Sequence, residues 1–172
     1  KMSTVRALTY MSEQNCPYDE EFDGNDFVAT HLLAENNTGP VGTMRIRWFA
    51  DFVKFERVCI LPEHRGDGLA QLMLGHAAEL VGRKGFRRVL FHAQARLVDL
   101  WSHTLRSRCR ENRPVISFSG YDYVEMEMWL DPHPETISID SDPYVLLRPE
   151  GDWDRAGILD VSADRNLQDK AA

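Results

Sequence analysis

The segment from residue 55 to residue 80, FERVCILPEHRGDGLAQLMLGHAAEL, constrains the fold more than any other part of the chain. Residues 55–61 are mostly apolar and stop at a proline, which predicts a strand buried on both faces. Gly66 and Gly68 follow, and two glycines so close together allow a sharp turn without side chains that would block a ligand. Apolar residues then recur at helical spacing from 69 to 81. The segment therefore predicts a strand, a tight turn and an amphipathic helix.

The predicted turn is suited to binding an anion. A glycine-rich turn that enters a helix directs several unpaired backbone N–H groups at one point, and the helix dipole adds positive potential there. The dipole contributes about 0.3–1 kcal/mol toward an anion at an exposed helix end, and up to about 2 kcal/mol in sheltered geometry. The pattern indicates a phosphate or pyrophosphate site, although an ordinary strand–turn–helix with a solvated loop has a similar composition.

The sequence of the turn narrows the kind of site. Neither the Walker pattern G-x-x-x-x-G-K-[ST] nor the dinucleotide pattern G-x-G-x-x-G is present. Arg65, Gly68 and Ala70 instead form R-x-x-G-x-A, which resembles the [QR]-x-x-G-x-[GA] motif of the GNAT superfamily of N-acetyltransferases. In that superfamily the turn holds the pyrophosphate of acetyl-coenzyme A (acetyl-CoA). The resemblance implies cofactor binding by the turn and its flanks, namely Cys59, Ile60, Leu61, Arg65, Gly66, Asp67, Gly68, Leu69 and Ala70.

Three further blocks resemble one branch of the superfamily, the ElaA-like group of small bacterial GNATs. Residues 15–32 contain N-C-P-Y and D-G-x-D followed by A-T-H-L, residues 93–98 read A-Q-A-R-L-V, and residues 120–126 read G-Y-D-Y-V-E-M. With the turn, these blocks extend the resemblance over residues 5–130.

The remaining pattern agrees with the GNAT order of elements. We predict helices over 2–14, 69–81 and 96–108, and strands over 27–35, 41–49, 55–61, 87–93, 116–118 and 123–130. Alternation in the second of these strands predicts one apolar and one polar face. The expected fold is α/β and of the GNAT type, a mixed and mostly antiparallel central sheet flanked by helices, with an acidic C-terminal extension.

Charge divides the chain near residue 130. Residues 131–172 hold ten acidic and four basic residues, a net charge of −6, so only −1 of the total of −7 belongs to residues 1–130. We expect residues 1–130 to form the acyltransferase domain. Residues 131–172 would form an extension that docks on a sheet edge or a second subunit, as in a homodimer, or a frayed tail. The negative charge disfavours nucleic acid as a partner, and no apolar run is long enough to span a membrane.

The cysteines bear on compartment and metal content. Cys16, Cys59 and Cys109 are odd in number and widely spaced, which argues against a disulfide framework or a zinc site. We therefore expect a cytoplasmic protein without a metal.

The resemblance implies an N-acetyltransferase that moves an acetyl group from acetyl-CoA to a primary amine of a small molecule or peptide. Attack would be direct, within a ternary complex. A backbone amide near residues 59–61 would polarise the thioester carbonyl, and the amine would have to lose a proton first. Two alternatives remain open: a longer-chain N-acyltransferase of the same fold, and a non-catalytic acyl-CoA-binding module.

One position departs from the GNAT pattern. The helix after A-Q-A often carries a tyrosine that protonates the leaving thiolate, but the matching residue here is Trp101. An indole is no proton source at neutral pH. Either another group is the acid or none is needed, and Trp101 is expected to line the cofactor site instead.

The candidate catalytic residues are His31, Glu56 and Tyr123. His31 would contact the substrate or a water relay, or be a hydrogen-bonded strand histidine. Glu56 starts the central strand, where some GNATs place a base, although a surface or cross-strand partner of Arg57 is the favoured interpretation. Tyr123 would line the mouth of the acceptor site or pack structurally.

Other polar residues are weaker candidates. Glu125 and Glu127 could bind an acceptor amine, and the acidic loop 19–26 could attract a cationic acceptor or remain solvated. Cys59 is better suited to packing than to nucleophilic attack. Basic residues that could meet the adenosine 3′-phosphate, or form a solvated face, are Arg83, Lys84, Arg106, Arg108 and Arg110.

Overall fold

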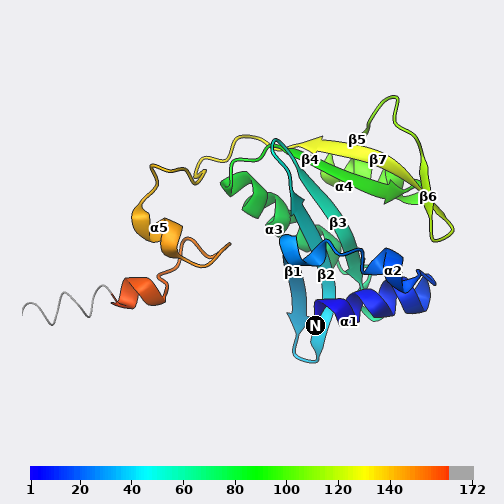
Figure 1. Cartoon of the computed structure of the whole chain (residues 1–172), viewed down its shortest axis with the longest axis horizontal. Helices are drawn as coiled ribbons and strands as arrows, with labels where there is room; N and C mark the ends of the chain where they lie inside the picture. Colours follow the sequence, from blue (N-terminus) through cyan, green and yellow to red (C-terminus); the bar gives the residue numbers. More distant parts are fainter. Residues whose placement is uncertain (163–172) are drawn as a thin grey trace, which may run out of the picture.

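A single sheet of seven strands runs through the protein, seen in a computed structural model that describes residues 1–162 (Figure 1). The strand order is β1-β2-β3-β4-β7-β5, with β6 also paired to β7. β3 and β4 are parallel, and the other five pairings are antiparallel. The strands are β1 (Thr30–Asn36), β2 (Gly39–Trp48), β3 (Val53–Ile60), β4 (Arg88–Gln94), β5 (Arg108–Cys109), β6 (Ile116–Phe118) and β7 (Tyr121–Trp129).

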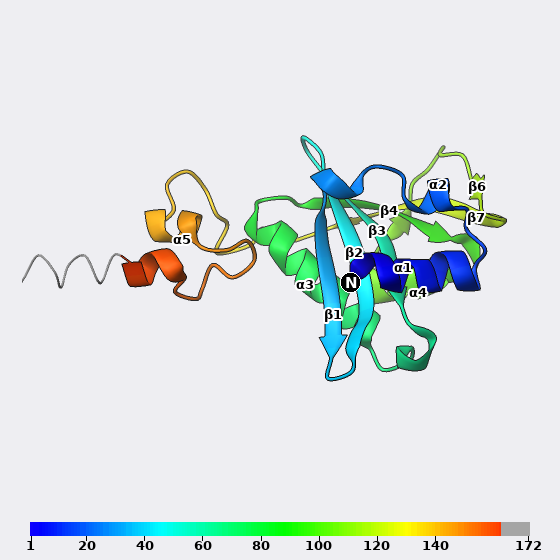
Figure 2. The same ribbon diagram turned by 60° about the horizontal axis from the view of Figure 1, so that its bottom comes forward.

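Helices cover both faces of the sheet. The N-terminal helix begins as α1 and continues as a π-helix, η1, and it crosses the β2–β3 side of one face (Figure 2). α3 and α4 lie on the opposite face. The helical elements are α1 (Met2–Arg6), η1 (Ala7–Glu13), α2 (Tyr18–Glu21), η2 (Asp26–Val28), η3 (Pro62–His64), α3 (Leu69–Arg83), η4 (Ala95–Leu97), α4 (Val98–Leu105) and α5 (Pro143–Leu147). This arrangement confirms the predicted α/β class with a mixed, mostly antiparallel sheet.

The main core lies between α3 and the sheet. Met73, Ala77 and Val81 recur on one side of α3 and are buried against apolar side chains of the strands. The strand residues of this core are Met44, Ile46, Val53, Phe55, Ile60, Val89, Phe91, Ala93, Met126 and Met128. Each fully buried side chain of this size contributes about 1.5–3 kcal/mol to the stability of the fold. The core therefore fixes α3, and with it the glycine turn, against β2 and β3.

The second face of β2 differs from its prediction. Alternation along this strand predicted a polar face, and Thr43 and Arg45 do lie on it, but both are almost fully buried. The reason is the N-terminal helix and the loop that follows it, which cover this face and supply charged partners. The sheet is thus buried on both faces at β2, and one of those faces is charged.

Two predicted elements end differently. Residues 26–28 form a short 3-10 helix instead of the start of a strand, and β1 begins at Thr30. The predicted helix over 96–108 ends at Leu105 because Arg106 adopts a left-handed conformation (φ 48°), and Arg108 and Cys109 then pair with β7. The first difference accompanies the ion pairs of Asp26 with Arg6 and Arg45, and the second accompanies the pairing of residues 108–109 with β7.

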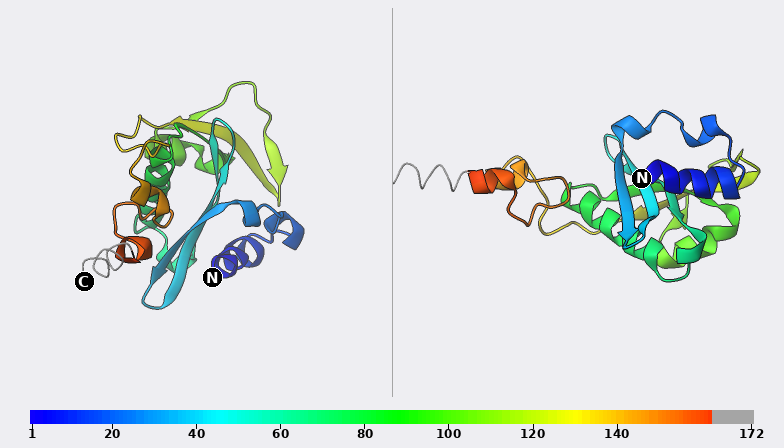
Figure 3. Two further views of the ribbon diagram at one scale, coloured as in Figure 1. Left: turned by 60° about the vertical axis from the view of Figure 1, so that its left-hand side comes forward. Right: turned by 90° about the horizontal axis from the view of Figure 1, so that it is seen from below.

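The C-terminal extension lies beyond the end of α3 (Figure 1, Figure 3). Arg83 pairs with Asp154 at 2.5 Å and lies 5.3 Å from the centre of the Trp153 ring, which is buried. Lys84 pairs with Glu150 at 2.5 Å. The division into an acyltransferase domain and an extension stays a prediction, and its residues 163–172 lie outside the described residues. Within residues 1–162, no helix combines the length and the hydropathy needed to cross a membrane.

Candidate active site

A cavity of about 530 Å³ opens where β3 and β4 separate. These parallel strands pair at three positions, from Val53–Val89 to Phe55–Phe91, and then diverge. The remaining halves of both strands line the cavity. The other walls come from the N-terminal helix, α3, α4 and the β6–β7 hairpin. The half of β3 beyond Phe55 consequently has no strand partner on this side and can pair with an extended ligand.

A β-bulge shapes the free half of β3. Arg57 has a φ of 53°, a left-handed conformation that is uncommon for a residue other than glycine. The register between β2 and β3 shifts at the same place, between the pairs Thr43–Cys59 and Arg45–Glu56. A bulge bends its strand and increases the local twist. It therefore turns β3 away from β4 and widens the cavity.

The glycine turn has the conformation that its sequence predicts. Gly66 (φ +93°) and Gly68 (φ +77°) are both left-handed, and open space lies where each Cβ would be. Gly68 precedes the first residue of α3, and no side chain caps this helix end. Its first N–H groups are therefore available to an anion such as a phosphate group.

Arg65 fastens the turn to the rest of the site. Its Nε donates to the carbonyl oxygen of Ile60 at 2.9 Å, and its guanidinium pairs with the Glu13 carboxylate at 2.5 and 2.8 Å. The turn is thereby tied to β3 and to the N-terminal helix. Arg65 thus has a structural role that its place in the motif did not predict.

Most of the predicted residues meet at this cavity. Seven of them line it: Cys59, Ile60, Arg65, Ala70, Trp101, Glu56 and Tyr123. Leu61, Gly66, Asp67, Gly68 and Leu69 do not line it. The last four form the turn between the lining residues Arg65 and Ala70.

His31 lies away from the cavity. Its Nε2 is 3.0 Å from the carbonyl oxygen of Asp26, and it is absent from the lining. This matches the interpretation of a hydrogen-bonded strand histidine and gives His31 no access to a substrate in the cavity.

Glu56 lines the cavity, but its carboxylate is held by hydrogen bonds and ion pairs with Arg45 and Lys54. Its carboxylate accepts from Arg45 at 2.6 and 2.9 Å and pairs with Lys54 at 2.6 Å. Burial would raise its pKa, but the hydrogen bonds and charges of Lys54 and Arg45 outweigh burial and hold the pKa below its usual range. Its partners differ from the predicted Arg57, and a carboxylate held in this way is a weak base.

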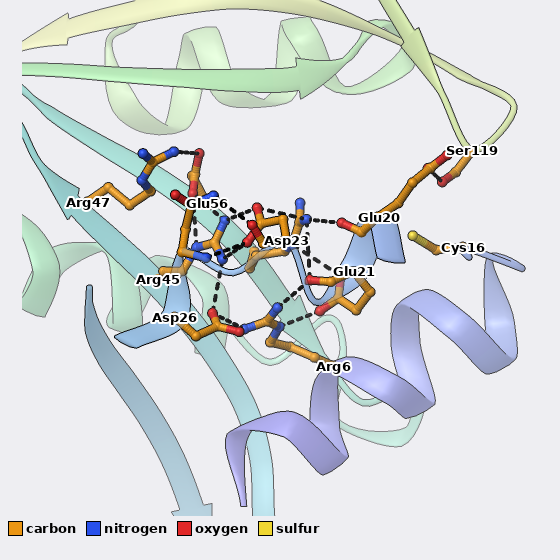
Figure 4. A network of polar contacts seen from close by, with 12 residues as sticks. Arg6, Cys16, Glu20, Glu21, Asp23, Asp26, Arg45, Arg47, Glu56 and Ser119 are labelled. Atoms are coloured by element: carbon orange, nitrogen blue, oxygen red, sulfur yellow. Dashed lines mark hydrogen bonds and ion pairs between the residues drawn. The ribbon is translucent and has the colours of Figure 1, made fainter. Parts of the chain in front are cut away.

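The acidic loop 19–26 contributes Glu21, Asp23 and Asp26 to an ionic network with Arg6, Arg45 and Arg57 (Figure 4), whereas Asp19 and Glu20 are exposed. Arg6 pairs with Glu21 and, at 2.6 Å, with Asp26. Arg45 binds Asp23 and Asp26 at 2.7 and 2.9 Å. Arg57 pairs with Glu21 at 3.1 Å. These acidic residues are therefore not free to attract a cationic acceptor.

The other residues considered for binding the acceptor or the 3′-phosphate also form ion pairs within the protein. Glu125 pairs with Arg110 at 2.7 Å and with Arg113 at 3.0 Å. Glu127 pairs with Arg88 and Arg108, each at 2.9 Å. Neither glutamate lines the cavity. Arg83 and Lys84 bind the C-terminal extension, so they do not form a free basic face for the 3′-phosphate.

Two phenols and the Cys59 thiol line the cavity with raised pKa values, and they are protonated at neutral pH. Burial raises the pKa of Cys59 to about 12, so its thiol is a poor nucleophile. Burial also raises the pKa of Tyr10 and Tyr123. The Tyr10 hydroxyl donates to the carbonyl oxygen of Val58 at 2.9 Å. The Tyr123 hydroxyl accepts from Gln94 at 3.3 Å, which leaves its own proton available to a ligand.

His92 is a lining residue that the sequence patterns did not single out. It lies on β4 one position beyond the last pair with β3, where the strands separate. Its only sequence signal is a polar residue inside the apolar run R-V-L-F-H-A.

Within residues 1–162, no group of three or more His, Cys, Asp or Glu side chains is placed to hold a metal ion.

A sequence profile described as an acetyltransferase (GNAT) domain matches residues 28–104. A Bacillus subtilis (strain 168) protein named as a candidate acetyltransferase is 27% identical over 145 residues, which are 83% of this chain and 88% of that protein. The matched residues include β3, the glycine turn, α3 and most of α4.

Solved structures share the fold. Escherichia coli ElaA superposes with a TM-score of 0.64 at 23% identity, over 73% of this chain and 86% of that one. A GNAT family acetyltransferase from Elizabethkingia anophelis, solved with acetyl-CoA bound, superposes with a TM-score of 0.54 at 14% identity, over 66% of this chain and 84% of that one.

Proposed function

We propose that this chain is a GNAT-type acetyltransferase and that it transfers an acetyl group from acetyl-CoA to a primary amine of a small molecule or peptide. Residues 28–104, which match the GNAT acetyltransferase domain, support this proposal. The observation that carries the proposal is the separation of β3 and β4 around a cavity that adjoins the glycine turn. The separated strand offers backbone groups to an extended ligand, and the turn offers N–H groups to an anion. A pantetheine chain ending in a pyrophosphate has both features. The acetyl-CoA in the Elizabethkingia anophelis acetyltransferase supports this choice.

Residues of this chain would hold acetyl-CoA in two places. The turn from Arg65 to Ala70 would bind the pyrophosphate, and the free half of β3 would pair with the pantetheine amides. When bound, acetyl-CoA supplies a thioester whose carbonyl carbon can accept an amine nitrogen. A backbone N–H of residues 59–61 would stabilise negative charge that develops on the carbonyl oxygen.

Direct attack by the amine suits the side chains of the cavity. A covalent route would need an ionised nucleophile, but the pKa of the Cys59 thiol is about 12. The acceptor would enter on the side of the N-terminal helices and the β6–β7 hairpin. There Ser119 donates to Glu20 at 2.5 Å, and both residues line the cavity (Figure 4).

Tyr123 is the proposed proton donor to the leaving thiolate, in place of the tyrosine that Trp101 replaces. Its ring is held by stacking on Phe118, with centroids 4.0 Å apart, and its raised pKa keeps the hydroxyl protonated. We expect Tyr123→Phe to lower kcat by about 100-fold, at the lower end of the range for a general acid. Affinity for acetyl-CoA, measured by calorimetry, should not change. An unaltered kcat would show that the thiolate leaves without this donor.

A longer acyl chain is a second candidate donor, because one part of the cavity wall is apolar. The residues of this part are Leu74, Phe91, Leu97, Trp101, Leu105 and Ile116. Such a wall could accept more carbon atoms than an acetyl group contains.

The test is a calorimetric titration with acetyl-CoA, coenzyme A and a long-chain acyl-CoA, followed by thiol release with a panel of amines. Acetyl-CoA binding with amine-dependent thiol release would support the proposal, and preference for the long chain would favour the second candidate. Binding without release on any amine would favour a non-catalytic acyl-CoA-binding module. Absence of binding would overturn the assignment of the cavity.

A further inference from the structure

His92 and Glu125 form a pair at the point where the sheet opens. They are register partners on β4 and β7, and His92 Nε2 lies 3.6 Å from Glu125 Oε2. Both side chains are mostly buried, with 16% of each exposed. Glu125 is held in place by Arg110 and Arg113. The histidine therefore has a fixed carboxylate on one side and the cavity on the other.

Each of the four carboxylates that line the cavity already has a hydrogen-bond or ion-pair partner. Glu13 pairs with Arg65, Glu21 pairs with Arg6 and Arg57, and Glu56 pairs with Arg45 and Lys54. Glu20 accepts from Ser119. In contrast, no hydrogen bond among the described residues holds either ring nitrogen of His92. It is the lining group best placed to act as a base.

We propose that His92 is the catalytic base that removes a proton from the acceptor amine, and that Glu125 is its positioning residue. This inference rests on the proposed function. An ammonium N–H bond of the acceptor breaks, and a new N–H bond forms on His92, which becomes an imidazolium ion. The amine nitrogen keeps the electron pair that it needs for attack. The proton then passes from His92 to water, and the ring returns to its neutral form.

The roles of the two ring nitrogens follow from the pair. Nε2 faces the carboxylate, so an Nε2–H group directed at Glu125 leaves the lone pair on Nδ1. Nδ1 is then the proton acceptor. The carboxylate also stabilises the imidazolium ion, and this orienting role resembles that of the aspartate in a catalytic triad.

Burial and the charges around His92 determine the pKa of its imidazole. Burial and the charge of Lys54 lower its pKa below the usual 6.5, while the carboxylates of Glu125 and Glu56 oppose that shift. Lys54 and Glu56 face it from β3, and Glu125 faces it from β7 with Arg110 and Arg113 behind. The ring is therefore neutral at pH 7. The ratio kcat/KM should rise with pH as the neutral ring forms, which produces an acidic limb below pH 6.5.

The first test measures the titration of the His92 imidazole by NMR in the protein without ligand. We expect the imidazole NMR signal that is missing in His92→Gln to titrate below pH 6.5 in the unaltered protein. Glu125→Gln removes a carboxylate that raises this pKa, so the signal should titrate at still lower pH. An unshifted signal in Glu125→Gln would overturn the role of Glu125 as the positioning residue.

The second test measures kcat/KM and its pH dependence with an amine that the unaltered protein acetylates. We expect His92→Gln to lower kcat/KM by about 100-fold and to remove the acidic limb. Acetyl-CoA affinity by calorimetry should be unchanged. The matched control is His103→Gln, an exposed histidine on α4 outside the cavity, which should keep both the rate and the limb.

The outcomes separate the two proposals. If the unaltered protein acetylates amines and His92→Gln keeps its rate or its acidic limb, His92 is not the base, while the proposed function stands. If His92→Gln folds poorly, Glu125→Gln still tests His92 as the base. In Glu125→Gln the acidic limb of kcat/KM must move to lower pH by the same amount as the NMR titration of His92, and a limb that stays in place would overturn the proposal. If the unaltered protein releases no thiol with any amine, the proposed function fails and this inference falls with it.

Discussion

Gly68→Glu is expected to abolish the binding of acetyl-CoA while the fold is retained. Gly68 lies at the N-terminal end of α3 with no atom within 4 Å of its Cβ position, so a side chain there enters the space in front of the helix. A glutamate would occupy the anion site and repel the pyrophosphate. We expect affinity to fall by at least about 1,000-fold, or roughly 4 kcal/mol, in a calorimetric titration with acetyl-CoA.

The control for this experiment separates backbone strain from the loss of the site. Gly24 has nearly the same φ (+76° against +77°), has equally open surroundings and lies in the loop before β1. Gly24→Glu therefore introduces the same strain and the same charge at a distance from the turn, and it should bind acetyl-CoA normally. Normal binding by Gly68→Glu would contradict the assignment of the turn. Loss of binding in both variants would point to a general effect on the fold.

The glycine turn could be predicted because its determinants are local. A run of apolar residues, two glycines and a helical repeat fix the conformation within a short segment, and the structure shows both glycines in left-handed conformations. The cofactor side of the site follows from these few residues. The family motif adds the identity of the ligand.

The acceptor side depends on pairings between distant residues. His92 becomes a candidate base because β4 pairs with β7 in the one register that places Glu125 opposite it, and because β3 leaves β4 just before it. A shift of one residue would direct the ring to the other face of the sheet. No pattern within β4 contains that information, so this residue emerges only from the assembled sheet.

The same reason explains why the ionic network of loop 19–26 could not be predicted from its sequence. Its composition suggests a solvated segment, but Arg6, Arg45 and Arg57 reach it from α1, β2 and β3. These arginines pair with three of its five acidic residues and hold the loop over the sheet. The network closes the face of β2 and β3 opposite the core, and Glu21, Glu56 and Arg57 also line the cavity. Its stability is therefore tied to the shape of the site.

Arg45→Met is expected to destabilise the protein by about 3–5 kcal/mol, because it removes the cation of a buried ionic cluster. The Arg45 side chain is only 1% exposed and binds Asp23, Asp26 and Glu56. Methionine fills much of the same space but leaves three carboxylates without this partner. The free energy of unfolding in urea at pH 7 measures the loss. Arg47→Met is the matched control, since Arg47 is more exposed and reaches Glu56 only at 3.8 Å, and it should lose less than about 1 kcal/mol.

The pH dependence of this loss identifies its cause. Burial would raise the pKa of Asp23 and Asp26, but hydrogen bonds from Arg45, and from Arg6 to Asp26, reverse the effect and hold both below their usual range. In the unaltered protein these groups therefore contribute stability above an unfolded pKa of about 3.9, and that stability is lost as the pH falls. In Arg45→Met the main opposing interaction is gone, so the buried carboxylates destabilise the fold most at neutral pH and less when protonated. The difference in unfolding free energy between the two proteins should shrink from pH 7 to pH 4. A constant difference across this range would mean that lost packing of the long side chain, and not unpaired carboxylates, causes the destabilisation.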